Sequence, residues 1–289
     1  MDRSSKAPPG SDSGSPEYRL LRDILLEQEG MDFPPNRETY LLGRATRRAR
    51  TLGITSLKAY IELLQHEETG PGELPILLDF LLAHRTEFFH DPAQFEFLMK
   101  SALPDLIKNA GVGVKRPLMA WSAGCSTGEE SYTLAMVFCE FAERFPGFNF
   151  RSQILATDIS NSLLDKARTA IYGLDRVRPI PLALKKKYLL RSKSAASQQV
   201  RIVPELRNMA KFRLLDLRQE GLFLREKMDL IFCRNVLCQF DTPTREAALT
   251  AMCNLMEPGA FLFTGTGENL QISQAPLYPV APDVFCLAS

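Results

Sequence analysis

Hydrophobic positions follow one pattern in the first third of the chain and another in the rest. From Tyr18 onward, apolar residues recur at helical spacing, as in YRLLRDILLEQEG, where Leu21, Ile24 and Leu25 share one face. Beyond Pro117, short apolar runs alternate with amphipathic segments. The first pattern predicts a small all-helical domain, and the second predicts a doubly wound, largely parallel α/β sheet.

The individual elements can be placed by residue number. The helical part should contain helices at about 18–29, 37–52 and 56–65, the last capped by Ser56. In the second part the expected strands are 117–121, 152–158, 211–217, 228–235 and 260–266, and the expected helices are 129–145, 162–172 and 242–256. Pro258 and Gly259 should form a turn before the last strand.

The chain is long enough, at 289 residues, for a large α/β domain and a smaller companion. Residues 1–17 are rich in Ser, Pro and Gly, which predicts a flexible tail. We expect the helical domain at 18–83 and the α/β domain at 84–289. The basic, polar stretch from about 173 to 206 fits an inserted β-subdomain better than another strand and helix pair.

Charge and composition exclude several classes of protein. The 35 basic and 34 acidic residues give a net charge of +1, which argues against binding of nucleic acid or anionic membrane by the whole surface. No apolar run is long enough to span a membrane, and the N-terminus has no signal-peptide core, so we expect a cytoplasmic protein without membrane insertion. The six cysteines show no zinc spacing and should be reduced thiols.

The first candidate site is the segment PLMAWSAGCSTGEES, in which a strand meets a loop of small residues that opens a helix. Gly124 and Gly128 let a ligand approach the backbone closely. Glu129 and Glu130 would repel a phosphate but could accept hydrogen bonds from the ammonium of an amino-acid ligand, which favours S-adenosylmethionine over NAD or ATP. An acid pair that only stabilises its own helix explains the local sequence about equally well.

The same loop matches the GxSxG pattern of hydrolases, with Ser126 as the nucleophile. In that fold the catalytic histidine follows the serine along the chain. His66, His84 and His90 all precede Ser126, so the hydrolase interpretation lacks its base.

Two further strand ends carry acids. Asp158 ends the run SQILATD, where a carboxylate can accept hydrogen bonds from both hydroxyls of a ribose; a cap for the following helix is the alternative. Asp216 and Leu217 end KFRLLDL, at the position where an adenine edge and face would be held. This second signal is weak by itself.

The run IFCRNVLCQFD ends a strand with two polar residues, Arg234 and Asn235. Polar groups directly after a buried run are typical of a cleft lining. A capped turn in which Asp241 leads the next helix explains Asp241 well but Asn235 less well.

Together these segments resemble the chemotaxis receptor methyltransferase family from about Tyr18 to the C-terminus. The family pattern STGEEPYS is present as STGEESYT, the strand-end acid as ATD, FCRNV is intact, and GxSEN is present as GTGEN with Glu268 and Asn269 retained. The resemblance implies a Rossmann-like methyltransferase sheet and methyl transfer from S-adenosylmethionine to glutamate side chains of chemoreceptors, with S-adenosylhomocysteine as the product.

The resemblance also implies roles for particular residues. The cofactor should be held by His84, Thr86, His90, Gly124, Glu130, Asp158, Asp216, Leu217, Arg234 and Asn235. The basic helix with Arg44, Arg47 and Arg48 should bind the acidic methylation region of a receptor, although a solvated helix face is the simpler interpretation of the residues alone. The inserted subdomain at 173–206 is the candidate for docking a receptor's C-terminal tail by strand addition.

The resemblance assigns the catalytic positions to His90, Gln239 and Arg234, and this chain departs from the family at the first two of them and at His84. His84 and His90 replace asparagine and arginine in the element NxTxFFR, and Gln239 replaces a tyrosine. We therefore expect slow methyl transfer, with a non-catalytic S-adenosylmethionine-binding adaptor as the alternative. A metal site at His84, His90 and Asp91 would have a poor ligand set, and we expect no metal.

Overall fold

The computed structural model forms two compact units. It describes residues 14–29, 31–33, 35–82, 86–192, 198–219, 222, 224–266, 268 and 275–288. The first unit comprises Met1–His84 together with Gln239–Asp241, and the second comprises Arg85–Cys238 together with Thr242–Ser289. His84, a predicted cofactor residue, and Asn269 of the GTGEN motif lie outside the described residues.

The first unit is helical. Its elements are α1 (Pro16–Glu29), the 3₁₀ turn η1 (Pro35–Arg37), α2 (Glu38–Thr51), α3 (Leu57–Gln65) and α4 (Gly70–Leu82). Helix α1 buries Leu21 and Leu25 on the predicted face and begins at Pro16, two residues earlier than expected. Ser56 caps α3 as predicted, because its side chain accepts a hydrogen bond from the Ala59 N–H.

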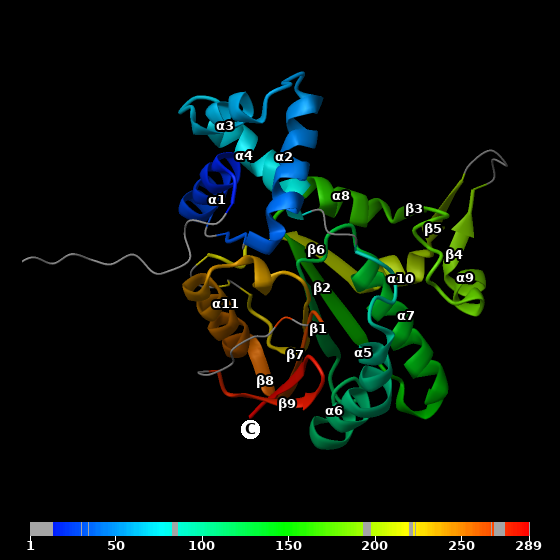
Figure 1. The fold of residues 1–289 in the computed structure, drawn as a ribbon. Coiled ribbons are helices and arrows are strands. Elements are labelled where there is room, and N and C mark those ends of the chain that lie inside the picture. The colour runs from blue at the N-terminus through cyan, green and yellow to red at the C-terminus, as the bar shows by residue number, and fades with distance from the viewer. Residues whose placement is uncertain are drawn as a thin grey trace, which may run out of the picture. The chain divides into compact units, whose positions relative to one another are not determined.

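The second unit is built on a seven-stranded sheet in the order β6-β2-β1-β7-β8-β10-β9 (Figure 1). The strands are β1 (Leu118–Ala123), β2 (Ser152–Asp158), β6 (Ala210–Leu214), β7 (Met228–Cys233), β8 (Met256–Thr264), β9 (Leu277–Ala281) and β10 (Val284–Leu287). The first five pair with one another in parallel, and β10 runs antiparallel to both of its neighbours, β8 and β9. The strand order reverses between β1 and β7, and ligands of such sheets bind at this switch point.

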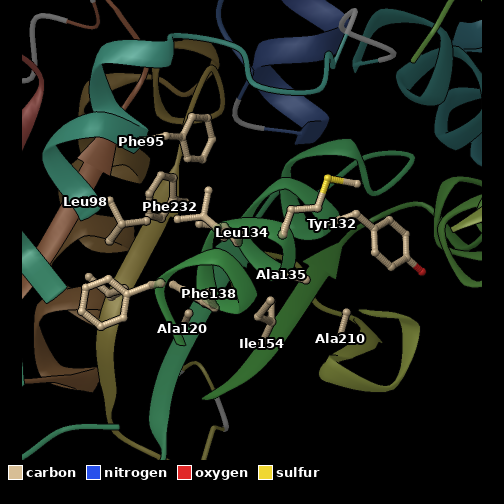
Figure 2. Packing of buried hydrophobic residues seen from close by; sticks show 14 of the residues in the cluster. Phe95, Leu98, Ala120, Tyr132, Leu134, Ala135, Phe138, Ile154, Ala210 and Phe232 are labelled. Carbon is tan, nitrogen blue, oxygen red and sulfur yellow. The ribbon is translucent and has the colours of Figure 1, made fainter. Parts of the chain in front are cut away.

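Helices cover both faces of the sheet, with α11 on the side opposite α7 (Figure 1). The helical elements are α5 (Pro92–Phe97), the π-helical turn η2 (Leu98–Ala102), α6 (Leu103–Ala110), α7 (Glu129–Arg144), η3 (Pro146–Phe148), α8 (Asn161–Thr169), α9 (Leu182–Tyr188), α10 (Pro204–Met209), η4 (Leu237–Gln239) and α11 (Thr242–Leu255). Figure 2 shows Phe95 and Leu98 packed beside Phe232 of the sheet and the apolar face of α7. This core anchors the helix that carries Glu129 and Glu130.

The inserted subdomain is a three-stranded antiparallel sheet in the order β3-β5-β4, formed by β3 (Ile171–Gly173), β4 (Leu189–Arg191) and β5 (Gln199–Ile202). The helix predicted to extend to Tyr172 instead ends at Thr169, because Ala170 adopts a left-handed conformation with φ of 54° and the chain turns into β3. The predicted fold class, an α/β sheet with a helical N-terminal unit and an inserted β-subdomain, is confirmed.

The turn predicted at Pro258 and Gly259 is wrong, because both residues lie inside β8. Pairing between β7 and β8 jumps from Met228 opposite Met256 to Leu230 opposite Phe261, so β8 bulges at this point. Gly259, with φ of 77°, accommodates the bulge. The local turn signal was real, but it bends a strand instead of ending one.

Within the part of the chain that the structure describes, no helix is both long and apolar enough to span a bilayer.

Candidate functional site

The predicted site residues of the α/β unit collect where neighbouring parallel strands end. The ends of β1 and β2 are level, with Ala123 opposite Thr157, and Asp158 lies opposite Leu214 of β6. The ends of β7 and β8 are level in the same way. This edge of the sheet therefore carries Gly124, Asp158, Asp216, Leu217, Arg234 and Asn235.

The glycine loop between β1 and α7 has backbone conformations that favour glycine. Gly124 and Gly128 have φ angles of 74° and 92°, and Ser126 has a φ of 50°. A Cβ atom on Gly124 would lie 2.4 Å from Cγ2 of Val236, and one on Gly128 would lie 2.9 Å from Cβ of Ala167. Both the backbone conformation and the close packing against Val236 and Ala167 therefore require glycine at these two positions.

Asp158 is tied to the glycine loop. Its carboxylate accepts hydrogen bonds from the N–H groups of Ser126 (2.8 Å) and Ser160 (3.1 Å). The cap of α8 is Ser160, whose hydroxyl accepts from the Leu163 N–H, so the alternative role of Asp158 as that helix cap is wrong. Each carboxylate oxygen has two lone pairs, so Asp158 retains acceptor capacity for a ribose hydroxyl.

Glu129 and Glu130 begin α7 and are both buried. Glu130 accepts hydrogen bonds from the Ser122 hydroxyl and from Nε of Arg234, each at 2.6 Å. Glu129 accepts from the Thr127 hydroxyl at 2.6 Å. Carboxylates held in this way are preorganised acceptors, and Glu130 can still accept a hydrogen bond from an ammonium group.

Arg234 is buried and holds several groups in place. Besides Glu130, its guanidinium donates to the His90 carbonyl at 2.7 Å and lies over the Phe95 and Phe232 rings, 5.4 and 5.9 Å from their centroids. Its side chain is 4% exposed. The guanidinium is therefore occupied by protein groups, and its position suits an organising role better than direct contact with a large substrate.

The segment that leads to His90 is strained and firmly attached. Phe89 and Asp91 both have φ of 55°, a conformation that is uncommon for residues with a side chain. The Phe89 N–H donates to the Thr133 hydroxyl at 3.2 Å. The His90 ring is 40% exposed, with Nδ1 3.1 Å from the Asp91 carboxylate. The backbone is thus fixed while the imidazole is accessible.

Asp216 and Leu217 follow β6, as predicted. Burial raises the pKa of Asp216, but hydrogen bonds from Arg218 outweigh burial and hold the pKa below its usual value. Leu217 is buried and lines a hollow of about 460 Å³ between this loop and α11. An ionised, oriented carboxylate beside an apolar side chain suits an adenine edge and face.

Asn235 adopts a left-handed conformation with φ of 60° directly after Arg234. A Cβ on Gly265 would lie only 2.7 Å from Oδ1 of Asn235, so the two strand-end loops are closely packed. Glu268 joins the same loops, because its carboxylate accepts from the N–H groups of Gly265 (2.8 Å) and Cys238 (3.2 Å). Glu268 belongs to the GTGEN motif but was not predicted as a site residue, and its hydrogen bonds hold these loops together.

Gln239, the third predicted catalytic residue, groups with the helical unit. Its carbonyl accepts a hydrogen bond from the Asp32 N–H at 3.0 Å, and Phe240 forms an antiparallel bridge with Met31. The Gln239 residue is 3% exposed.

The three arginines of the basic helix α2 differ in their surroundings. Arg48 donates from Nε and Nη2 to the buried carboxylate of Glu73, both at 2.7 Å, and the Tyr60 hydroxyl donates to the same carboxylate. Arg44 lies over the Tyr40 ring, and Arg47 is exposed. The helix therefore offers Arg44 and Arg47 to a partner more readily than Arg48.

Two contact residues had no signal in the sequence. Gln94 donates from Nε2 to the Thr264 carbonyl at 2.8 Å, and Arg176 pairs with Glu129. Their partners are far away in sequence, and nothing in the neighbouring residues marks them. Among the described residues, no three His, Cys, Asp or Glu side chains are grouped as metal ligands.

Both units match known protein domains. Residues 16–82 match the family described as CheR methyltransferase, all-alpha domain, and residues 84–283 match the CheR methyltransferase, SAM binding domain. A chemotaxis protein methyltransferase of Borreliella burgdorferi is 34% identical over 255 residues, which cover 88% of each chain. Chemotaxis protein methyltransferase 2 of Pseudomonas aeruginosa is 32% identical over 253 residues, covering 88% of this chain and 86% of that protein.

A third relative, the chemotaxis protein methyltransferase of Escherichia coli, is 29% identical over 252 residues, or 87% of this chain and 84% of that protein. The domain matches cover the glycine loop, the strand-end acids and the helical unit in their order along the chain. The chain therefore belongs to the CheR methyltransferase family, and its cofactor is S-adenosylmethionine.

Proposed function

We propose that the protein transfers the methyl group of S-adenosylmethionine to glutamate side-chain carboxylates in the cytoplasmic domain of methyl-accepting chemoreceptors. The observation that carries this proposal is the match to chemotaxis protein methyltransferases over 87% or more of the chain. It includes both the helical unit and the cofactor unit. The relatives' names supply the chemotactic context, and the receptor glutamate is our inference from the resemblance.

The proposed cofactor site uses the strand-end groups. Asp158 would accept hydrogen bonds from the ribose hydroxyls, Glu130 from the ammonium, and Asp216 from the adenine amine, while Gly124 permits close approach. When bound, S-adenosylmethionine supplies an electrophilic methyl group on a positively charged sulfur. His84 and Thr86 complete the proposed set.

The chemistry requires alignment more than proton transfer. A glutamate carboxylate is ionised near neutral pH, so the enzyme needs no general base to make it nucleophilic. Correct placement of the reacting atoms can supply roughly 7 kcal/mol or more of the barrier reduction. We assign His90, whose ring is 40% exposed, to steering the incoming carboxylate, and Arg234 to fixing the His90 backbone. Gln239 remains the third proposed member of this set.

The receptor would be recognised by the basic helix. Exposed guanidinium groups attract an acidic partner segment over about 8 Å at physiological ionic strength. Arg44 and Arg47 are the proposed contacts, and Arg48 would act through its ion pair with Glu73.

We further propose that the inserted subdomain docks a receptor tail. Strands β3 and β4 form the two edges of its sheet, and Ile171 and Leu190 on these strands are 46% and 47% exposed. An extended peptide can add to such an edge through main-chain hydrogen bonds while its side chains cover exposed apolar groups.

The proposal is tested by incubating the protein with methyl-labelled S-adenosylmethionine and membranes that contain chemoreceptors. We expect receptor label that is released by base, as a methyl ester is. Membranes without receptors are the control. Binding of cofactor and receptor without any methyl ester, on every receptor of the same cell, would contradict the enzyme and favour the adaptor.

A further inference from the structure

Arg176 lies in the turn after β3, at the entry to the inserted subdomain. Its Nη2 atom lies 2.5 Å from Oε1 of Glu129 and 2.8 Å from the Thr86 carbonyl oxygen. One guanidinium therefore joins the first turn of α7 to the segment that leads to His90. Neither partner is near Arg176 in the sequence.

The pair is built around a deeply buried acid. The Glu129 side chain is 1% exposed, whereas that of Arg176 is 36% exposed. The second carboxylate oxygen of Glu129 accepts a hydrogen bond from the Thr127 hydroxyl. A carboxylate in such surroundings is costly without a cationic partner, so Arg176 determines where this acid can lie.

A second arginine makes the matching connection at the other end of the same segment. Arg234 binds the His90 carbonyl and Glu130, as Arg176 binds the Thr86 carbonyl and Glu129. Residues 86–90 are thus fixed at both ends to adjacent acids at the start of α7. The two residues at its ends, Thr86 and His90, are both proposed cofactor contacts.

Tyr172, on β3 itself, supports the same arrangement. Its hydroxyl donates to the Thr127 carbonyl at 2.7 Å, and its ring meets the Phe88 ring edge-on with centroids 5.1 Å apart. Phe88 is fully buried inside the 86–90 segment. The start of the inserted subdomain therefore contacts both the glycine loop and this segment.

We propose that Arg176 is a positioning residue for cofactor binding, which fixes Thr86 and the start of α7 relative to each other through the Thr86 carbonyl and Glu129. The inference rests on the proposed placement of S-adenosylmethionine beside Thr86 and Glu130. Without Arg176, only the contact from Arg234 would remain of this pair, and it holds the 86–90 segment at its His90 end. The loss in the free energy of cofactor binding should then be larger than the loss in the free energy of unfolding.

The experiment measures the affinity for S-adenosylhomocysteine by calorimetry and the urea midpoint without ligand, for wild type, Arg176→Ala and Arg178→Ala. Arg178 is exposed, lies in the same turn and serves as the matched control. We expect Arg176→Ala to raise the dissociation constant about tenfold or more, the scale of losing charge-assisted hydrogen bonds, and Arg178→Ala to leave it unchanged.

Two further variants protect the test against misfolding. Arg176→Lys keeps a cation for Glu129, but an ammonium on a different stem does not reproduce the bridge to Thr86, so stability should recover more than affinity. Glu129→Gln and Arg176→Ala together should weaken binding by less than the sum of the single effects, because they disrupt one interaction.

Several results would overturn the inference. A wild-type dissociation constant for Arg176→Ala, even with a lowered urea midpoint, would show that the pair is only structural. Full affinity in Arg176→Lys, or strictly additive effects with Glu129→Gln, would also contradict the bridge. If wild type itself does not bind S-adenosylhomocysteine, the proposed cofactor site fails first and this inference with it.

Discussion

The Arg234 guanidinium donates from Nε to Oε2 of Glu130 across 2.6 Å, although the two residues are 104 positions apart. This contact joins the end of β7 to the start of α7 inside the candidate site. Removal of one partner from a buried ion pair typically costs about 3–5 kcal/mol. We therefore expect Arg234→Ala to lower the free energy of unfolding by about that amount and to weaken S-adenosylhomocysteine binding. Urea unfolding and calorimetry measure the two effects, with the exposed Arg225→Ala as control.

The second prediction concerns Asp158. Asp158→Ala removes the proposed acceptor for the ribose and releases the Ser126 N–H. Cofactor binding should weaken by about 1.5–3 kcal/mol, the range for hydrogen bonds to a charged group. Calorimetry with S-adenosylhomocysteine measures the change, and Asp165→Ala, an exposed acid of α8, should have no effect. Unchanged affinity in a folded Asp158→Ala protein would remove Asp158 from the pocket.

The third prediction separates the arginines of α2. Arg44→Glu with Arg47→Glu should weaken association with receptor membranes and leave cofactor affinity intact. Increasing salt should weaken wild-type association in the same direction, because exposed charges are screened. Sedimentation of receptor membranes measures the bound fraction. A double variant that binds membranes as well as wild type would support the solvated-face interpretation.

The fourth prediction uses the pH dependence of stability. Burial raises the pKa of Glu73, but hydrogen bonds from Arg48 and Tyr60 outweigh burial and lower the pKa below its usual value. A carboxyl with a lowered pKa in the folded state stabilises the fold above its unfolded pKa of about 4.3, and this contribution is lost as the pH falls. The stability difference between wild type and Arg48→Met should therefore shrink as the pH falls below about 4.3.

Circular dichroism is the appropriate probe for this experiment, because the single tryptophan, Trp121, lies in β1 and reports on the α/β unit. Arg47→Met is the control, and its stability difference from wild type should not change with pH. A pH-independent difference for Arg48→Met would show that the ion pair with Glu73 contributes nothing measurable.

The fifth prediction tests the departures from the family. His90→Arg with Gln239→Tyr should raise the rate of receptor methyl-ester formation, because arginine keeps its charge at every working pH and tyrosine adds a rigid aromatic wall. Cofactor affinity should remain within about tenfold, or roughly 1.4 kcal/mol. Single-turnover methylation at saturating cofactor measures the rate. A faster wild type would show instead that the pocket is adapted to its own residues.

The sequence predicted the strand ends of the site because polar residues directly follow apolar runs there. Asp158 and Arg234 can be predicted in this way, and the structure places both at the predicted edge of the sheet. The role of Arg176 could not be predicted, because this residue lies in a basic stretch and its partners are 47 and 90 residues away in the sequence. Long-range pairing of this kind leaves no trace in the local pattern.

Local sequence patterns also gave a wrong or incomplete prediction where tertiary contacts determine the structure. Pro258 and Gly259 indicate a turn, but β7 pairs with β8 on both sides of them, at Met256 and at Phe261, so they lie within a bulged strand. Arg48 is indistinguishable in sequence from Arg44 and Arg47. Its different surroundings depend on Glu73, which comes from another helix.

Residues 239–241 group with the helical unit, so an exchange of that unit between relatives involves more than one segment of the chain. A chimaera that exchanges only the chain up to residue 84 would pair Met31 and Asp32 of one protein with the foreign segment around Phe240 and Gln239. We expect such hybrids to need a second, three-residue graft after Cys238. The helical unit of this protein is thus built from two separate stretches of the chain, and a gene fragment that ends at residue 84 does not carry all of it.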